Sequence, residues 1–193
     1  AEEEAQRQRL HQQAEEARLR RRAQEEARKQ AEREWLEGIQ KGAEGVKHYL
    51  SVLLLQNSQE QKKEMDPDRI AALQSLCALF EQIQKHPEEV NKRKIKLSNP
   101  NFHRDIGRHE GGIELLVAAG FRPTMLPAAD NANDGEAKAD DDEQPDIAFL
   151  ISKEPNLEHD MDGWMAWFDL NKTTLEILQT ELQKVQGSKR SRR

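Results

Sequence analysis

The large apolar side chains of this chain are almost absent from its first 40 residues. That segment consists mainly of Ala, Glu, Gln and Arg, so it has nothing with which to bury a core of its own. The 153 residues that follow have a near-normal composition and are numerous enough for one hydrophobic core. We therefore expect one globular domain with an N-terminal extension, although 34% of all residues are charged.

Residues 1–40 are predicted to form a long charged helix, because they contain no proline and only one glycine, Gly38. Glu25 and Lys29 place an acid four residues before a base, the better orientation for helical ion pairs. Large residues are missing from the heptad a and d positions, so a strong coiled coil is not expected. The segment is interpreted as a solvated spacer, with a helix that binds a partner as the alternative.

The chain is predicted to have three parts. A helical arm covers residues 1–41, a globular domain covers residues 42–186, and a basic tail covers residues 187–193. Within the domain, residues 130–146 are rich in Asp, Glu, Ala and Asn and have no apolar anchor, so a flexible loop is expected there.

Apolar residues at helical spacing predict the main helices of the domain. One such stripe runs from Val46 to Leu54 and a second from Ile70 to Ile83, which the cap signal Asp66-Pro67-Asp68 precedes. His86-Pro87 is expected to end the second helix. Cys77 lies in the second stripe and is interpreted as a core residue; the alternative, a catalytic thiol, would need a base that nothing nearby supplies.

Further helices are expected at residues 100–107, at residues 113–119 and from Asp160 to residue 186, with Gly187 as the final stop signal. The last of these helices carries large apolar residues at steps of three and four. That stripe consists of Trp164, Phe168, Leu175, Leu178, Leu182 and Val185, with Asn171 as a polar interruption.

Three strands are predicted. Residues 92–97 alternate between basic and apolar side chains, which is the period of a strand. Residues 121–126 form a second strand, interrupted at Pro123, and Ile147 to Ile151 is a continuous apolar run typical of a buried strand. The second and third strands are expected to pair antiparallel across the acidic loop, so the fold class is α+β and mainly helical.

Composition excludes several classes of partner and location. The net charge of −6 disfavours nucleic acid, and no apolar run approaches the roughly 18 residues of a membrane span. The single cysteine permits no intramolecular disulfide, which favours a reducing compartment. No signal peptide opens the sequence, and its start at Ala1 suggests a piece of a longer protein. We expect a cytoplasmic location, with Lys189–Arg193 as either a nuclear address or a solvated end.

No constellation of catalytic residues is found. His103 and His109 do not have the spacing of a metal site, and Gly111-Gly112 lacks the wider glycine pattern of a phosphate-binding loop. The carboxylates at residues 140–142 lie in the polar loop, where little desolvation would raise a pKa for acid catalysis. We therefore expect no catalytic, metal-binding or cofactor-binding site.

The candidate binding site is the strand at residues 92–97. Lys92, Lys94 and Lys96 share one face of this strand, and Asn99 follows it. Lysines attract acidic groups and an Asn amide both donates and accepts hydrogen bonds, so the strand suits an extended acidic peptide. An adjacent apolar pocket would have to supply specificity, and a merely solvated strand face is the alternative.

The stretch from Leu79 to Phe121 resembles the PUB (or PUG) domain of peptide N-glycanase and of ubiquitin-pathway adaptors. The resemblance rests on Pro87, Lys94–Leu97, Asn99–Phe102, Gly111–Leu116 and Gly120-Phe121. Together with the later strands and the closing helix, it covers about three-quarters of the chain.

The resemblance implies a helical domain with a three-stranded antiparallel sheet and a non-catalytic adaptor function. PUB domains bind the acidic, aromatic C-terminal tail of the valosin-containing AAA ATPase, or similar motifs, in ubiquitin- and proteasome-linked quality control such as ER-associated degradation. In the family the peptide lies against the first strand and the Gly-Phe turn. This implies contacts from Lys96, Leu97, Asn99, Gly120 and Phe121.

Two positions of the family pattern carry other residue types here. Gln82 matches an asparagine that is important in peptide N-glycanase, and Lys92 matches a tyrosine that packs on the aromatic residue of the peptide. A glutamine can still form hydrogen bonds, and a lysine can lie over an aromatic ring as a cation.

Two other functions stay open. One is a scaffold in which the long N-terminal helix, residues 1–40, is the main interaction surface. The other is a ubiquitin-binding module, because residues 112–121 are similar to the end of a ubiquitin-associated domain, although that domain is a three-helix bundle and strands are predicted here.

Overall fold

The computed structural model of the chain describes residues 2–55, 66–126 and 147–190. It divides into two compact units, residues 1–39 and residues 40–193. The predicted loop at residues 130–146 lies outside the described residues.

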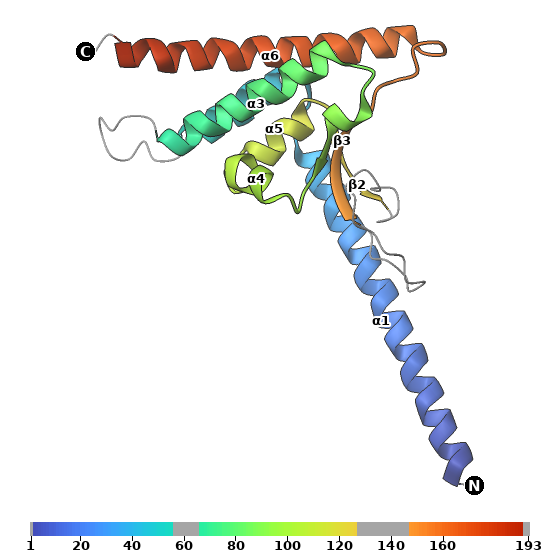
Figure 1. Cartoon of the computed structure of the whole chain (residues 1–193). Helices are drawn as coiled ribbons and strands as arrows, with labels where there is room; N and C mark the ends of the chain where they lie inside the picture. The colour runs from blue at the N-terminus through green and yellow to red at the C-terminus, as the bar shows by residue number, and fades with distance from the viewer. Residues whose placement is uncertain (1, 56–65, 127–146, 191–193) are drawn as a thin grey trace, which may run out of the picture. The chain divides into compact units, whose positions relative to one another are not determined.

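The first unit is the long helix α1, Glu2–Gly38, drawn in blue in Figure 1. Its described side chains are almost all exposed, as expected for a helix without an apolar stripe. The Nζ of Lys29 lies 2.6 Å from the Oε1 of Glu25, and this pairing lowers the pKa of Glu25. Exposed pairs of this kind each contribute little to stability, so they support the helix collectively.

The second unit contains the remaining elements, and its mainly helical α+β class is confirmed. Among the described residues, two long helices and one of intermediate length accompany a small sheet and four short helical segments. In chain order they are α2 Gly42–Leu55, α3 Pro67–Lys85, η1 Val90–Arg93, β1 Lys94–Lys96, α4 Pro100–Phe102, η2 His103–Gly107, α5 Gly112–Ala118, β2 Phe121–Leu126, β3 Ile147–Ser152 and α6 Met161–Arg190.

The sheet has the strand order β1-β3-β2, and both pairings are antiparallel. The predicted antiparallel pairing of β2 with β3 is confirmed. The predicted interruption at Pro123 is wrong, because β2 continues through it opposite Leu150. Proline is tolerated here because β2 is an edge strand of this sheet. No described strand lies on its outer side, so no hydrogen bond between strands is lost there when the N–H is missing.

The core lies where α3 packs along α6 and α2 packs against α5, and Figure 1 shows α3 and α6 side by side. Its largest fully buried side chains come from six elements of the second unit: Val46, Leu53, Leu73, Leu76, Phe80, Ile83, Leu115, Leu116, Val117, Phe121, Leu150 and Leu178. Cys77 is only 5% exposed, so its prediction as a core residue is confirmed. The predicted N-cap is also confirmed, since Asp66 Oδ1 accepts a hydrogen bond of 3.0 Å from the N–H of Asp68.

Helix α6 begins as predicted but ends later. Asp160 Oδ1 accepts a hydrogen bond of 2.9 Å from the N–H of Gly163, and its carbonyl accepts one from the N–H of Trp164. The prediction that Gly187 ends the helix is wrong, because α6 continues to Arg190. A glycine within a helix costs only about 1 kcal/mol relative to alanine, and a helix this long tolerates that cost.

None of the helices among the described residues is both long enough and apolar enough to cross a lipid bilayer.

Candidate functional site

The basic segment before the sheet is built around a buried arginine. Arg93 is 5% exposed, and its guanidinium donates to the carbonyls of Pro87 (3.2 Å) and Ser152 (3.0 Å) and to the carboxylate of Glu154 (2.5 Å). It also lies over the ring of Trp167, 5.6 Å from the centroid. Each of the three guanidinium nitrogens therefore has a hydrogen-bond partner, which lowers the cost of burying the charge.

This burial corrects the predicted strand at residues 92–97, which is a strand only over Lys94–Lys96. Val90–Arg93 form a 3₁₀ turn instead, because the chain turns there to carry Arg93 into its pocket. Lys92 accordingly does not share a strand face with the other two lysines. Its Nζ lies 3.9 Å from a carboxylate oxygen of Glu89.

Lys94 and Lys96 do share one face of β1. In the register of the sheet they lie opposite Ile151 and Phe149 of β3. The Nζ of Lys94 lies 4.4 Å from the centroid of the Phe149 ring, within the range of a cation–π contact. Lys96 is exposed, so its ammonium is the more accessible of the two.

The turn after β1 organises Leu97 and Asn99. The N–H of Leu97 donates to the carbonyl of Ala148 (3.0 Å), and the N–H of Asn99 donates to the carbonyl of Lys96 (3.0 Å). The Oδ1 of Asn99 accepts from the N–H of Asn101 at 2.9 Å and so caps the short helix α4. The Asn99 side chain is exposed, and its Nδ2 makes no hydrogen bond to any described residue. This donor can therefore serve a ligand.

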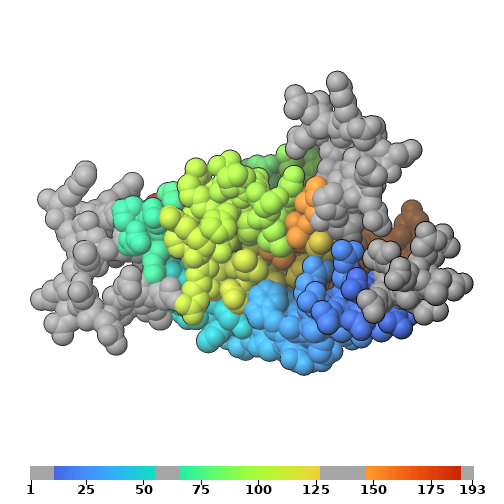
Figure 2. Space-filling view, turned by 90° about the horizontal axis from the view of Figure 1, so that it is seen from below, coloured from blue at the N-terminus to red at the C-terminus, as the bar shows by residue number. Residues whose placement is uncertain are grey.

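The outer edge of β1 can accept a further strand. Among the strands that the structure describes, β1 pairs only with β3, so one of its edges is open. Because the N–H of Leu97 points toward β3, the alternation of a strand directs the N–H of Lys96 away from it. An extended peptide could pair with this edge, as in other cases of strand addition. Figure 2 shows the orange surface of β3 beside the green surface of the segment that contains β1.

Gly120 and Phe121 lie at the start of β2, which is separated from β1 by β3. Gly120 has a φ of +103°, a left-handed value that suits glycine after a helix. The side chain of Phe121 is fully buried, and its ring contacts that of Phe80 edge to face with 6.1 Å between centroids. Any contribution of Phe121 to binding therefore comes through its backbone or through its support of the core.

Gln82 is exposed near the end of α3, where its carbonyl accepts a hydrogen bond of 3.0 Å from the N–H of His86. The eight predicted contact residues therefore come from four places. Lys94, Lys96, Leu97 and Asn99 line one strand and its turn, whereas Gln82, Lys92 and the Gly120-Phe121 pair lie on other elements. Their roles in binding stay predictions.

Arg122 lies on the same face of the sheet as Lys94 and was not predicted from the sequence. In the register it lies opposite Ile151, as Lys94 does from the other side. Its Nη1 donates to the carbonyls of Val117 (2.9 Å) and Phe121 (2.6 Å), so it satisfies a carbonyl near the end of α5. A basic residue two positions after a helix-ending glycine is the signal that could have found it.

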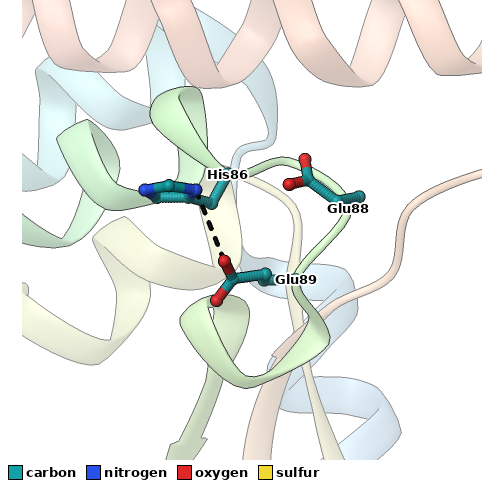
Figure 3. A group of neighbouring side chains, drawn as sticks. All are labelled: His86, Glu88 and Glu89. Atoms are coloured by element: carbon teal, nitrogen blue, oxygen red, sulfur yellow. Dashed lines mark ion pairs between the residues drawn. The ribbon is translucent and has the colours of Figure 1, made fainter.

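His86, Glu88 and Glu89 form a second cluster that was not predicted, shown in Figure 3. One ligand atom from each lies within 4.8 Å of the others. The Nδ1 of His86 lies 3.4 Å from Glu89, whose other carboxylate oxygen faces Lys92. Glu89 already faces Lys92, and exposed acidic groups of this kind are common without a metal ion, so we assign none here.

The sequence profile of one protein family, the PUB domain, matches residues 67–162. The match begins at the first residue of α3 and ends at the second residue of α6, so it contains the whole sheet.

Curated relatives align over a part of this region. "UBX domain-containing protein 6" of Homo sapiens is 38% identical over 72 residues, which are 37% of this chain and 16% of that protein. The protein of the same name from Mus musculus is 35% identical over 72 residues, again 37% of this chain and 16% of that protein. "Plant UBX domain-containing protein 2" of Arabidopsis thaliana is 39% identical over 51 residues, which are 26% of this chain and 11% of that protein. The chain thus matches about a sixth or less of the length of these relatives.

Proposed function

Because residues 67–162 of this chain are a PUB domain, we propose that the chain is a non-catalytic adaptor module that docks acidic peptide tails containing an aromatic residue. The C-terminal tail of the valosin-containing AAA ATPase is the proposed partner, and similar acidic motifs are the wider class. The working context is ubiquitin- and proteasome-linked quality control, in line with the UBX-domain proteins among its relatives.

The observation that carries this proposal is the open edge of β1 with an exposed lysine on it. Lys96 offers an ammonium that is accessible to solvent and a backbone N–H that points away from β3. Asn99 adds a side-chain donor one turn further along. An extended peptide needs backbone pairing for affinity, and an acidic one gains from the nearby cations.

The aromatic residue of such a peptide could contact a lysine on this face of the sheet. Lys94 already lies over the ring of Phe149, which places an apolar ring and a cation together beside the edge strand. Because Phe149 itself is only 3% exposed, a peptide aromatic would pack against the partly exposed side chain of Lys94. Gln82, Lys92, Gly120 and Phe121 remain proposed contacts on the strength of the family pattern.

The proposed functional boundaries are residues 42–186, which add α2 and most of α6 to the matched segment. The reason is that α2 packs on α5 and α6 packs on α3, so these helices complete the core that supports β1. Residues 1–41 are proposed as a spacer, because the described side chains of α1 up to Glu34 are exposed on all faces.

The test is a titration of the whole chain with a fluorescent acidic peptide that ends in an aromatic-containing motif. We expect saturable binding in the micromolar range, weakened by Asn99→Ala. Deletion of residues 1–34 should leave the affinity unchanged, whereas loss of binding on that deletion would favour the scaffold function. Failure to saturate at millimolar peptide, or an Asn99→Ala variant with unchanged affinity, would contradict the proposal.

A separate titration addresses the ubiquitin-binding alternative. Isotope-labelled ubiquitin should show no shift of its amide resonances when the chain is added. Residue-specific shifts on ubiquitin would replace the peptide-docking proposal with that alternative.

A further inference from the structure

The first turns of α6, together with the turn before the helix, expose an apolar patch that the proposed tail site does not use. Leu157, Met161 and Met165 are 47%, 64% and 48% exposed. Trp164 and Phe168 lie beside the two methionines on α6 and are only partly buried. These five residues are here named the α6 patch; four of them, Met161, Trp164, Met165 and Phe168, are spaced so that they lie on one side of the helix, and Leu157 lies in the turn before it. Figure 1 shows this end of α6 in orange, where the chain arrives from β3.

Of the patch residues, Trp164 and Phe168 were expected to belong to a core or packing stripe of this helix. The core side of these turns is instead taken by Trp167, which is 8% exposed and donates its Nε1–H to the hydroxyl of Ser152 at 2.8 Å. Because Trp167 and the fully buried Asn171 point inward, Met161 and Met165 point outward. Clustered apolar residues on a surface indicate an interaction site more often than isolated ones do.

The aromatic part of the patch is rigid. The rings of Trp164 and Phe168 stack with 5.2 Å between centroids and 6° between planes. The Nε1–H of Trp164 donates to Glu154 at 2.7 Å, and Glu154 is held in turn by the buried Arg93. Docking of a partner on these rings would therefore cost little conformational entropy, because the rings are already ordered. The two exposed methionines add adaptable, polarizable contacts at their side.

The rim of the patch is acidic. Its exposed carboxylates are Glu158, Asp160, Asp162 and Asp169, while Lys172 is the exposed lysine on the same stretch of helix. A negative rim repels anionic lipid headgroups and phosphates, so a membrane or a nucleic acid does not fit this surface. It attracts lysines and arginines, which steer a cationic partner toward the apolar centre.

We propose that the α6 patch is a docking site for a basic amphipathic helix of a partner protein. The partner helix would place apolar anchors on Met161, Met165 and the stacked rings, and its flanking lysines or arginines would face the four rim carboxylates. Helix-in-groove recognition of this kind uses anchors at steps of three and four residues, which is the spacing of the patch itself. The site involves none of the residues proposed to bind the acidic tail, and its ligand carries the opposite charge.

The probe is a labelled model helix of about 18 residues, long enough to hold helical structure, with leucines at helical spacing and lysines elsewhere. Its control is the same peptide with glutamates in place of the lysines. Fluorescence anisotropy with the full chain should show saturable binding of the lysine peptide that weakens as salt is raised. The glutamate peptide should bind at least about ten-fold more weakly.

The variant Met161→Gln/Met165→Gln removes the exposed anchors while keeping good helix formers in place. It should weaken binding of the lysine peptide about ten-fold, as expected for anchor residues at an interface. Met125→Gln is the matched control, because Met125 is a methionine of similar exposure (44%) on β2, and it should leave the affinity unchanged. Urea unfolding should give the same midpoint for both variants.

Three results would overturn the proposal: equal binding of the lysine and glutamate peptides, unchanged affinity in the double variant, or a concentration-dependent dimer that the double variant abolishes. The last result would show that a second copy of the chain covers the patch.

Discussion

Arg93 and Glu154 form an ion pair, with Nη2 2.5 Å from Oε2 and side chains that are 7% and 23% exposed. The pair joins the turn before β1 to the segment after β3. The other carboxylate oxygen of Glu154 accepts from Trp164 at the start of α6. One ion pair therefore supports both surfaces, the edge strand proposed for acidic tails and the α6 patch proposed for basic helices.

Arg93→Ala should be strongly destabilising, because it leaves Glu154 with a largely buried and unpaired charge. Breaking a buried pair costs about 3–5 kcal/mol, and the partial exposure of Glu154 places the expected loss near the lower end of that range. Lys96→Ala is the matched control, since Lys96 is exposed and should change stability by no more than about 0.5 kcal/mol. The midpoints of urea unfolding measure both values, and equal midpoints would show that the pair has no structural role.

Gly111→Ala should be destabilising for two reasons. Gly111 has a φ of +83°, and an added Cβ would lie 2.7 Å from the carbonyl oxygen of Tyr49. Left-handed backbone costs a non-glycine residue on the order of 1–3 kcal/mol, and the clash adds to this cost. Gly187→Ala is the control, because no atom lies within 4 Å of its added Cβ and the position is helical. Thermal unfolding should show a lower Tm for the first variant and an equal or higher Tm for the second.

The thiol of Cys77 should be unreactive in the folded chain. Burial, with a smaller contribution from the charge of Glu81, raises the pKa of Cys77 to about 11, so little thiolate forms near neutral pH. The raised pKa favours the protonated folded state, and this contribution to stability is lost as the pH rises from about 9 toward 11. A thiol-specific chromogenic reagent at pH 8 should react slowly with native protein and rapidly in concentrated urea. Equal rates in the two conditions would contradict the buried position.

Stability should fall as the pH drops below about 6.5, because the pKa of His109 is lowered in the fold. Burial is the main cause, and the neighbouring charges of Arg108 and Arg69 act in the same direction. The unfolded chain then takes up a proton before the folded chain does, so acid favours unfolding. Unfolding midpoints between pH 7 and pH 5 should drop less steeply in His109→Gln than in the natural chain. The same slope in both proteins would rule out His109 as the cause.

The order of helices and strands could be predicted because their signals are local. The Asp66 cap, the apolar stripes and the glycine before Phe121 each act within a few residues, and the structure has the corresponding elements. The helix continuing past Gly187 was not predicted because a glycine only weakens a helix, and nothing else in the sequence compels an end there.

The candidate site was only partly predictable, because it depends on contacts that are distant in sequence. Within the basic run, Lys92, Arg93 and Lys94 look alike, yet only Arg93 is buried. Its partners, Ser152 and Glu154, lie about 60 positions away in the chain. For the same reason, the alternation that predicted a strand could not reveal that Lys92 belongs to a turn. Nor could the apolar spacing of the last helix show that Trp167, not Trp164, faces the core.

The central claim is that an acidic peptide pairs with the edge of β1, and a charge-exchange titration tests it most directly. Lys96→Glu should weaken binding of an acidic aromatic tail about five-fold or more at low salt, since it turns an attraction into a repulsion on an exposed edge. A peptide with one acidic residue changed to lysine should bind the natural chain more weakly and should recover affinity toward Lys96→Glu. That compensation is the predicted result; a Lys96→Glu variant that binds both peptides as the natural chain does would contradict docking at β1.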